Sequence, residues 1–115
     1  MGDEVRDFVF VDDVVRALIF LGLTLPSGDA QSVLNVCSGV PTQIGDLARW
    51  LLCLEGRGAQ AICFLPGGNP NPIKACVGDP ARLAAAGVKL PAISTQHLVD
   101  TLSWVRQGSP LGSPQ

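Results

Sequence analysis

The first sixteen residues constrain the fold more than any other part of this chain. A charged pair, Arg6-Asp7, leads into a short apolar run, and the acidic pair Asp12-Asp13 separates that run from a nearly all-apolar stretch. This pattern predicts a strand over residues 7–11 and a helix over residues 13–24. Either acid can accept hydrogen bonds from the free amides that start the helix, where its charge suits the helix dipole. Such an element usually lies inside a fold, so we expect the sequence to begin in the middle of a larger one.

Composition disfavours several classes of protein. The chain has 115 residues, enough for one domain of modest size, and a net charge of −2 with both signs scattered. We therefore expect no nucleic-acid partner and no membrane-surface helix. The longest apolar run, residues 14–25, carries Arg16 and is shorter than the roughly 20 residues that span a bilayer. A cytoplasmic location is the simplest expectation.

The four cysteines and the single histidine do not form a metal-site pattern. No two of them stand at a spacing typical of zinc ligands, so we expect no metal. Each cysteine is predicted to be a small buried apolar side chain, and without secretory signals a disulfide framework is disfavoured. An enzyme that uses these thiols is also disfavoured, because no histidine lies near a cysteine in the sequence. The residues concerned are Cys37, Cys53, Cys63, Cys76 and His97.

The chain is unusually apolar for its size. Hydrophobic residues make up 47% of it and charged residues only 16%, against a usual charged share of about a quarter. Because a small domain exposes much of its surface, we expect part of this apolar content to pack against another domain or subunit. The chain also contains no tyrosine, which excludes any mechanism that needs a tyrosine acid or base from it.

Periodicity and turn residues divide the rest of the chain into short elements. Thr42, Asp79 and Ser94 are predicted to cap helices, and the proline-rich segment 66–72 is predicted to be a loop. The expected fold is a small mixed α/β domain with a few short strands and about four helices. The further strands are expected over residues 32–37, 61–65 and 74–77, and the further helices over residues 42–54, 80–87 and from 94 onward.

Three segments in order resemble one family. They are RDFVFVDDV at residues 6–14, NVCSG at residues 35–39 followed by Thr42-Gln43-Ile44, and VGDPARL at residues 77–83. Together they resemble the C-terminal, substrate-binding part of the extended short-chain dehydrogenase/reductases, the NAD-dependent epimerase/dehydratase family. The second and third segments lean toward the branch that handles GDP-mannose and GDP-4-keto-6-deoxymannose. On this resemblance residues 1–107 form the substrate-binding region, and residues 108–115 form a disordered tail.

The resemblance implies a substrate half without its cofactor half. Members of this family bind NAD or NADP on an N-terminal Rossmann domain with a glycine-rich turn, and they use a Tyr-x-x-x-Lys pair for proton transfer. Neither element occurs here, so the chain alone is expected to be inactive in hydride transfer. The implied partners are a GDP- or UDP-linked nucleotide sugar and an N-terminal Rossmann domain or subunit, with a homodimer as a further option. The alternative is a stand-alone, non-catalytic binding or interaction module derived from such an enzyme.

Two candidate substrate-binding residues follow from the resemblance. Arg6 matches the family arginine that approaches the nucleotide diphosphate, and a guanidinium can bind phosphate oxygens in a bidentate fashion. The competing interpretation of Arg6 is a surface ion pair with Asp7 or Asp13. In the proline-rich loop, Asn69 stands where the family has a second arginine, so it can donate hydrogen bonds but brings no charge. The competing interpretation of Asn69 is a plain surface loop.

Asn35 and Ser38 complete the candidate site, and no catalytic residue is assigned to this chain. Asn35 matches the family asparagine of NVCSG, although its amide can equally tie a strand end to the next turn. Ser38 can line the sugar-nucleotide pocket, but a tight turn explains it as well. Asp79 is interpreted as a helix cap. His97 is interpreted as a substitute for a capping glutamate rather than as a catalytic group.

Overall fold

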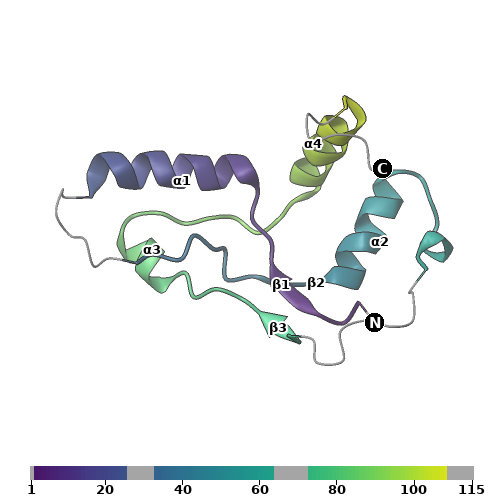
Figure 1. Ribbon diagram of the computed structural model, residues 1–115, viewed down its shortest axis with the longest axis horizontal. Helices are drawn as coiled ribbons and strands as arrows, with labels where there is room; N and C mark the ends of the chain where they lie inside the picture. Colours follow the sequence, from purple (N-terminus) through teal and green to yellow (C-terminus); the bar gives the residue numbers. More distant parts are fainter. Residues whose placement is uncertain (1, 26–32, 64–72, 109–115) are drawn as a thin grey trace.

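The computed structural model of the chain describes residues 2–25, 33–63 and 73–108 (Figure 1). It is a mixed α/β arrangement of four helices and a three-stranded sheet, which confirms the expected fold class. The elements in order are β1 (Val5–Asp7), α1 (Val11–Thr24), β2 (Pro41–Gln43), α2 (Ile44–Leu54), the short 3-10 helix η1 (Ala59–Ala61), β3 (Ala75–Cys76), α3 (Ala81–Ala85) and α4 (Thr95–Arg106).

β1 is the central strand of the sheet. It pairs antiparallel with β2, where Arg6 lies opposite Thr42, and parallel with β3, where Arg6 lies opposite Cys76. The prediction of a strand over residues 7–11 is therefore shifted, because the chain has left the sheet at Phe8 and winds into α1 from Val11. The sheet thus places Arg6 and Asp7 at the centre of the molecule.

α1 begins two residues earlier than predicted. Its N-cap is Phe10, whose side chain makes no capping bond, so the prediction that Asp12 or Asp13 caps the helix is wrong. Both acids lie inside the first turn, where their charge still suits the positive end of the helix dipole. Asp13 is held instead by contacts to Arg16 and His97.

The middle of the chain differs most from the predictions. Residues 33–37 form no strand and run as irregular structure, while Thr42, the predicted cap, pairs within β2 so that Gln43 takes the N-cap position of α2. The strand predicted from residue 61 is wrong for its described part, where η1 ends instead. Residues 64 and 65 lie outside the described residues, as do the proline-rich loop and the tail beyond residue 108.

The two C-terminal helices follow their cap signals. Asp79 Oδ1 accepts a hydrogen bond from the amide of Ala81 at 2.9 Å, although Pro80 holds the N-cap position of α3. Ser94 caps α4 in a capping box: its Oγ accepts from the amide of His97, and Nδ1 of His97 accepts from the amide of Ser94, both at 3.3 Å. The prediction of a capping role for His97 is confirmed.

The hydrophobic core of the described residues is small. Its buried apolar side chains are Ala17, Leu21, Cys37, Leu83 and Leu98. The radius of gyration is 17.1 Å, whereas a compact chain of this length has about 13 Å. Figure 1 shows the reason: α1 and α2 extend away from the sheet in different directions. None of the described helices is both long enough and apolar enough to cross a membrane.

The prediction that every cysteine is buried is wrong. Cys37 is buried, but Cys53, Cys63 and Cys76 are exposed, and all four carry free thiols. Cys76 lies in β3, which has β1 as its only strand neighbour in the described sheet. Both residues of this edge strand, Ala75 and Cys76, are exposed.

Candidate functional site

Asp7, at the end of β1, organises the centre of the molecule. Its Oδ1 accepts hydrogen bonds from the hydroxyl of Ser38 at 2.5 Å and from the amide of Ser38 at 3.2 Å. Its Oδ2 accepts from the amides of Gly39 at 2.8 Å and of Gly78 at 3.3 Å. We call Asp7, Ser38, Gly39 and Gly78 the Asp7 junction. One carboxylate thereby joins three segments that are far apart in the sequence.

The donors at the junction stabilise a charged Asp7. Burial on its own raises the pKa of Asp7, but the hydroxyl of Ser38 and the amides of Gly39, Ser38 and Gly78 together hold it below its ordinary value. The pKa of the neighbouring Cys37 is raised, first by burial and then by the charges of Asp7 and Asp79. A thiol whose pKa is raised is a poor nucleophile, so Cys37 is suited to packing rather than to chemistry.

Two glycines at the junction are required by close contacts. A Cβ added to Gly78 would lie 2.5 Å from both Cβ and Sγ of Cys37. Gly39 has a φ of +76°, and a Cβ there would lie 2.8 Å from Cγ of Pro80. No ordinary side chain fits either space without displacing a neighbour. The glycine residues of NVCSG and VGDPARL therefore have a packing reason.

Arg6 is held by backbone carbonyls rather than by an acid. Its Nη1 donates to the carbonyl oxygen of Val5 at 2.7 Å and to that of Ile73 at 3.0 Å. No carboxylate of the described residues pairs with it, since Asp7 is bound at the junction and Asp13 is bound elsewhere. The expected alternative of an ion pair with Asp7 or Asp13 is therefore not formed. Ile73 follows directly after residues 64–72, so the guanidinium lies at the end of the proline-rich segment.

The other candidate residues have different surroundings. The hydroxyl of Ser38 donates to Asp7 and accepts from the amide of Val40 at 3.1 Å, which supports the tight-turn interpretation. Asn35 is exposed, and its carbonyl oxygen lies 3.6 Å from the thiol of Cys37. Asn69 lies outside the described residues. The structure thus brings Ser38 to the end of the strand that carries Arg6.

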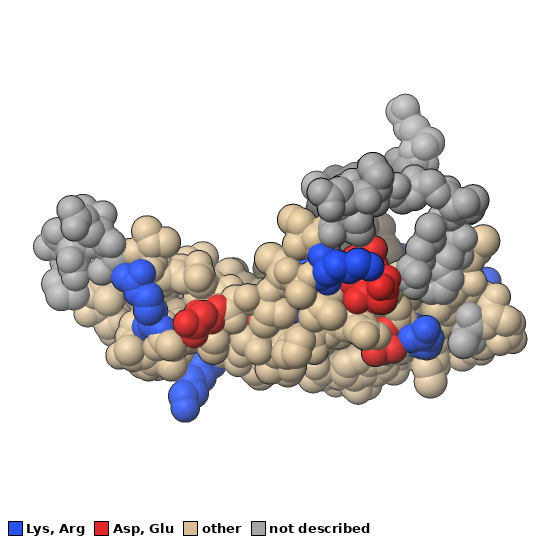
Figure 2. Space-filling view, turned by 90° about the horizontal axis from the view of Figure 1, so that it is seen from below, with Lys and Arg blue, Asp and Glu red and all other residues tan. Residues whose placement is uncertain are grey.

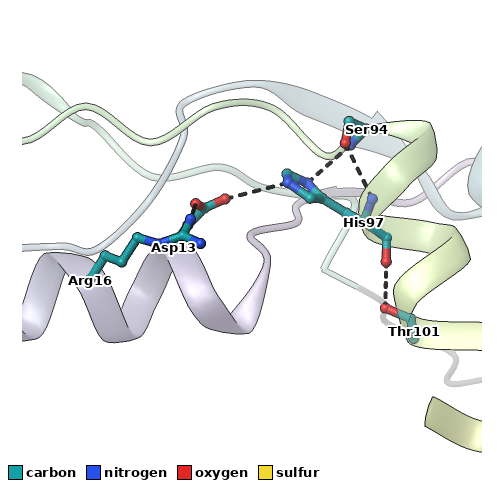
Figure 3. A network of polar contacts seen from close by, with 5 residues as sticks. All are labelled: Asp13, Arg16, Ser94, His97 and Thr101. Atoms are coloured by element: carbon teal, nitrogen blue, oxygen red, sulfur yellow. Dashed lines mark hydrogen bonds and ion pairs between the residues drawn. The ribbon is translucent and has the colours of Figure 1, made fainter. Parts of the chain in front are cut away.

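A second polar contact joins α1 to α4 (Figure 3). Nε2 of His97 lies 3.6 Å from Oδ2 of Asp13, whose Oδ1 accepts from Arg16 at 3.0 Å. Because Nδ1 of His97 accepts from Ser94, the neutral ring carries its hydrogen on Nε2, toward Asp13. The ring also stacks on Phe10, with the ring centroids 4.6 Å apart.

Sequence reasoning missed the role of Asp7 and the contact between Asp13 and His97. Asp7 was visible only as half of a charged pair, and its donors lie 31 or more residues away in sequence. A signal was nevertheless present, because an acid at a strand end and two glycine-containing turns are typical of a carboxylate that binds backbone amides. Nothing in the sequence pointed from Asp13 to His97.

Two hollows lie apart from the candidate substrate-binding residues. One, of about 550 Å³, lies between the segment Val9–Asp12 and the α4 residues Asp100, Thr101 and Trp104. The other, of about 490 Å³, lies over β2 and α2 beside Trp50. Neither is lined by Arg6, Asn35 or Ser38. The described residues bring no three metal-ligating side chains together, and the face in Figure 2 carries scattered charges of both signs.

A comparison with solved structures gives a clear match. The structure of RMD from Pseudomonas aeruginosa, complexed with NADPH, superimposes on this chain with a TM-score of 0.70 and 31% sequence identity. The match covers 93% of this chain. This chain is similar to part of an NADPH-binding protein. No protein-family model matches the chain, and no curated protein matches it either.

The match covers nearly all of this chain but only about a third of RMD. This chain spans 34% of the RMD chain, so about two thirds of RMD has no counterpart here. Nearly all of this chain therefore corresponds to about a third of a larger protein. The similarity extends beyond fold class, because nearly a third of the aligned residues are identical.

Proposed function

We propose that this chain supplies the substrate-binding portion of an NAD(P)-dependent nucleotide-sugar epimerase, dehydratase or reductase. The observation that carries the proposal is the 31% identity to RMD, a protein solved with NADPH, over 93% of this chain. The three segments that resemble the extended short-chain dehydrogenase/reductases support the same conclusion, and they favour a GDP-linked sugar. We propose a cytoplasmic location for the assembled enzyme.

In this proposal Arg6 binds the diphosphate of the nucleotide sugar. Support comes from its surroundings: its Nη1 bonds two carbonyl oxygens, and no described acid neutralises its charge. A guanidinium that is fixed in place but not neutralised retains its attraction for a phosphate. Asn69, four positions before Ile73 in the sequence, would add amide hydrogen bonds but no charge.

Ser38 and Asn35 would contribute through the loop that joins them. The Asp7 junction fixes the backbone at Ser38 and Gly39, so the residues next to it are held without help from a ligand. Asn35 is exposed and can reach a bound sugar or base. Ser38, whose hydroxyl is already bonded to Asp7, would act mainly by holding the loop in place.

The cofactor and the catalytic groups would come from another polypeptide region. This chain contains no tyrosine, and its only glycine pair, Gly67-Gly68, has the proline-rich run of residues 70–72 after it rather than a predicted helix. NAD or NADP, the Tyr-x-x-x-Lys pair and hydride transfer are therefore assigned to a Rossmann partner. The chain on its own would bind substrate but would not convert it.

Calorimetric titration with GDP-mannose and with UDP-glucose tests the proposal. We expect the Arg6→Ala variant to bind the preferred nucleotide sugar about ten-fold or more weakly, because a hydrogen bond to a charged group contributes about 1.5–3 kcal/mol. Arg6→Lys should recover part of the loss by restoring charge without the planar fork. Arg57→Ala, at an exposed arginine outside the candidate site, is the control and should bind like the wild type. Equal binding by all four proteins, or no binding, would contradict the proposal.

The alternative of a stand-alone binding module is favoured by one observation, the neutral Asn69 where the family has an arginine. A module of this kind would bind a ligand but would need no Rossmann partner. The small core and the open arrangement of the helices count against it, since a self-sufficient module should bury more of its apolar surface. Analytical ultracentrifugation separates the two, because a stand-alone module stays soluble and monomeric at high concentration.

A further inference from the structure

The outer face of α1 is an apolar stripe without a partner among the described residues. Its side chains recur at spacings of three and four, which places them on one face of a helix. They are exposed by 64% at Val11, 47% at Val15, 57% at Leu18, 59% at Ile19 and 82% at Leu23. With Gly22, which lies among them on the same face, we call these residues the α1 stripe. It runs for about 18 Å along the helix.

The stripe is a second apolar face, because the opposite face of α1 is already packed. Ala17 and Leu21 are buried, and the ring of Phe20, although 42% exposed, approaches Gly87. Asp13, on the same inner side, contacts His97 of α4. An ordinary surface helix has one apolar face toward the core and a polar face toward solvent. α1 is apolar on both, with Asp12 and Arg16 at the margin of the stripe.

Gly22 gives an independent indication that something packs closely on this face. Glycine is among the least favourable residues inside a helix, and it is retained where a turn or a close contact requires it. Neither reason is found among the described residues, since Gly22 is helical and a Cβ added there would meet none of their atoms within 4 Å. A backbone or ring packed directly against the helix at this point would supply the missing reason.

We propose that the α1 stripe is the docking surface for the NAD(P)-binding Rossmann polypeptide, an inference that rests on the proposed function. The size of the missing part supports this occupant. In RMD the counterpart of this fold belongs to a chain about three times as long, so the matching portion has about twice its own length of protein beside it. The 17.1 Å radius of gyration and the small core also describe a body that is completed by another.

A second copy of this chain is the competing occupant. Two stripes packed together would bury one helix face on each copy, but they would leave the small core and the open sheet edges as they are. A Rossmann polypeptide brings a large apolar layer of its own. For that reason we assign the stripe to it and make self-association an outcome of the test.

Co-expression tests the assignment. The tagged chain is produced together with an untagged polypeptide that holds the two thirds of Pseudomonas aeruginosa RMD without a counterpart here. We expect a soluble complex that co-purifies and binds NADPH. Leu18→Asp and Leu23→Asp should weaken the complex about ten-fold or more, because each would place a charge inside the contact. Val105→Asp is the matched control: Val105 is 55% exposed in α4, so its substitution should leave the complex unchanged.

Gly22 separates docking from folding. Gly22→Ala should raise the melting temperature of the isolated chain, because alanine favours the helix, and yet weaken the complex; Gly22→Leu should weaken it further. If Gly22 had no role in docking, Gly22→Ala would raise the melting temperature without weakening the complex.

Three outcomes would overturn the assignment. The first is a complex equally strong with every stripe variant. The second is an RMD polypeptide that stays insoluble or unbound beside the wild-type chain. The third is a concentration-dependent dimer of this chain alone that Leu23→Asp abolishes. Loss of nucleotide-sugar binding in Arg6→Ala with co-purification intact would instead count only against the placement of the diphosphate.

Discussion

The Asp7 junction and the α1 stripe are opposites. At the junction every oxygen of a partly buried carboxylate has donors, and the two glycines are there because nothing larger fits. On the stripe, five large side chains are exposed and a glycine faces open space. The comparison teaches that the polar centre of this chain is complete by itself, whereas its apolar surface is not. A domain can therefore fix a central loop by itself while part of its apolar surface stays uncovered.

Removing the Asp7 carboxylate should disrupt the Asp7 junction and should have the largest effect on stability. In Asp7→Ala, four hydrogen bonds are lost and partly buried amides are left without acceptors, so we expect a loss of about 3 kcal/mol or more in the free energy of unfolding. Urea denaturation followed by tryptophan fluorescence measures it. Asp46→Ala, which removes an exposed ion pair with Arg49, is the control and should change stability by less than about 1 kcal/mol. Similar losses in both variants would show that the junction has no special role.

Replacing glycine by alanine should change the stability of the chain in opposite directions in the two regions. Gly78→Ala forces a methyl group against Cys37 and should destabilise the chain by about 1–3 kcal/mol. Gly22→Ala meets no neighbour and should stabilise the isolated chain by up to about 1 kcal/mol. Thermal denaturation of both variants beside the wild type checks the pair. Destabilisation by Gly22→Ala would mean that the stripe is already packed in the isolated chain.

Substitutions of His97 measure how much its contacts within α4 and with Asp13 of α1 contribute to stability. His97→Ala removes half of the capping box and the contact to Asp13, and we expect it to cost about 1 kcal/mol in the free energy of unfolding. His97→Gln keeps a side chain suited to the capping box and should recover part of this loss. Chemical denaturation of the two variants measures the difference. Equal stability of His97→Ala and the wild type would contradict both contacts.

The smallest expected effect is the pH dependence of the junction. Because the folded pKa of Asp7 lies below its ordinary value of 3.8, its contribution to stability is present above that pH. The contribution is lost as the pH falls through the folded pKa. Denaturation midpoints at pH 7 and pH 3 should therefore differ more for the wild type than for Asp7→Asn. Parallel pH profiles of the two proteins would exclude this source of acid sensitivity.

Helices were easier to predict from this sequence than strands. Ser94 and Asp79 act within three residues of their own positions, so local cap signals located the start of α4 correctly and placed the start of α3 one residue early. The strands are two or three residues long and pair with distant segments, so period-two patterns misplaced β1 and gave no indication of β2. An apolar run such as residues 33–37 looks like a strand, but the bonds of the adjoining residues to Asp7 hold the chain there in irregular structure.

The candidate site was predictable only as far as resemblance reached. Arg6 could be chosen because it lies in a motif, yet its contact with Ile73 spans 67 positions and has no local signature. The apolar excess correctly indicated an uncovered surface, but composition cannot say which helix carries it. That answer required the geometry of α1, where the buried and the exposed apolar residues lie on opposite faces of the helix.

The order of the strands also has a kinetic consequence. The central strand β1 comes first in the chain, and its two neighbours follow 36 and 70 positions later by the pairings of Arg6, Thr42 and Cys76. No local hairpin can start the sheet, so it closes only after long loops have formed, which is slow compared with helix formation. During this interval α1 can already be wound while the sheet is still open. A nascent chain would then expose the apolar face of α1 before its own centre has formed. Early contact with the proposed Rossmann partner would cover that face and would improve the yield of folded protein.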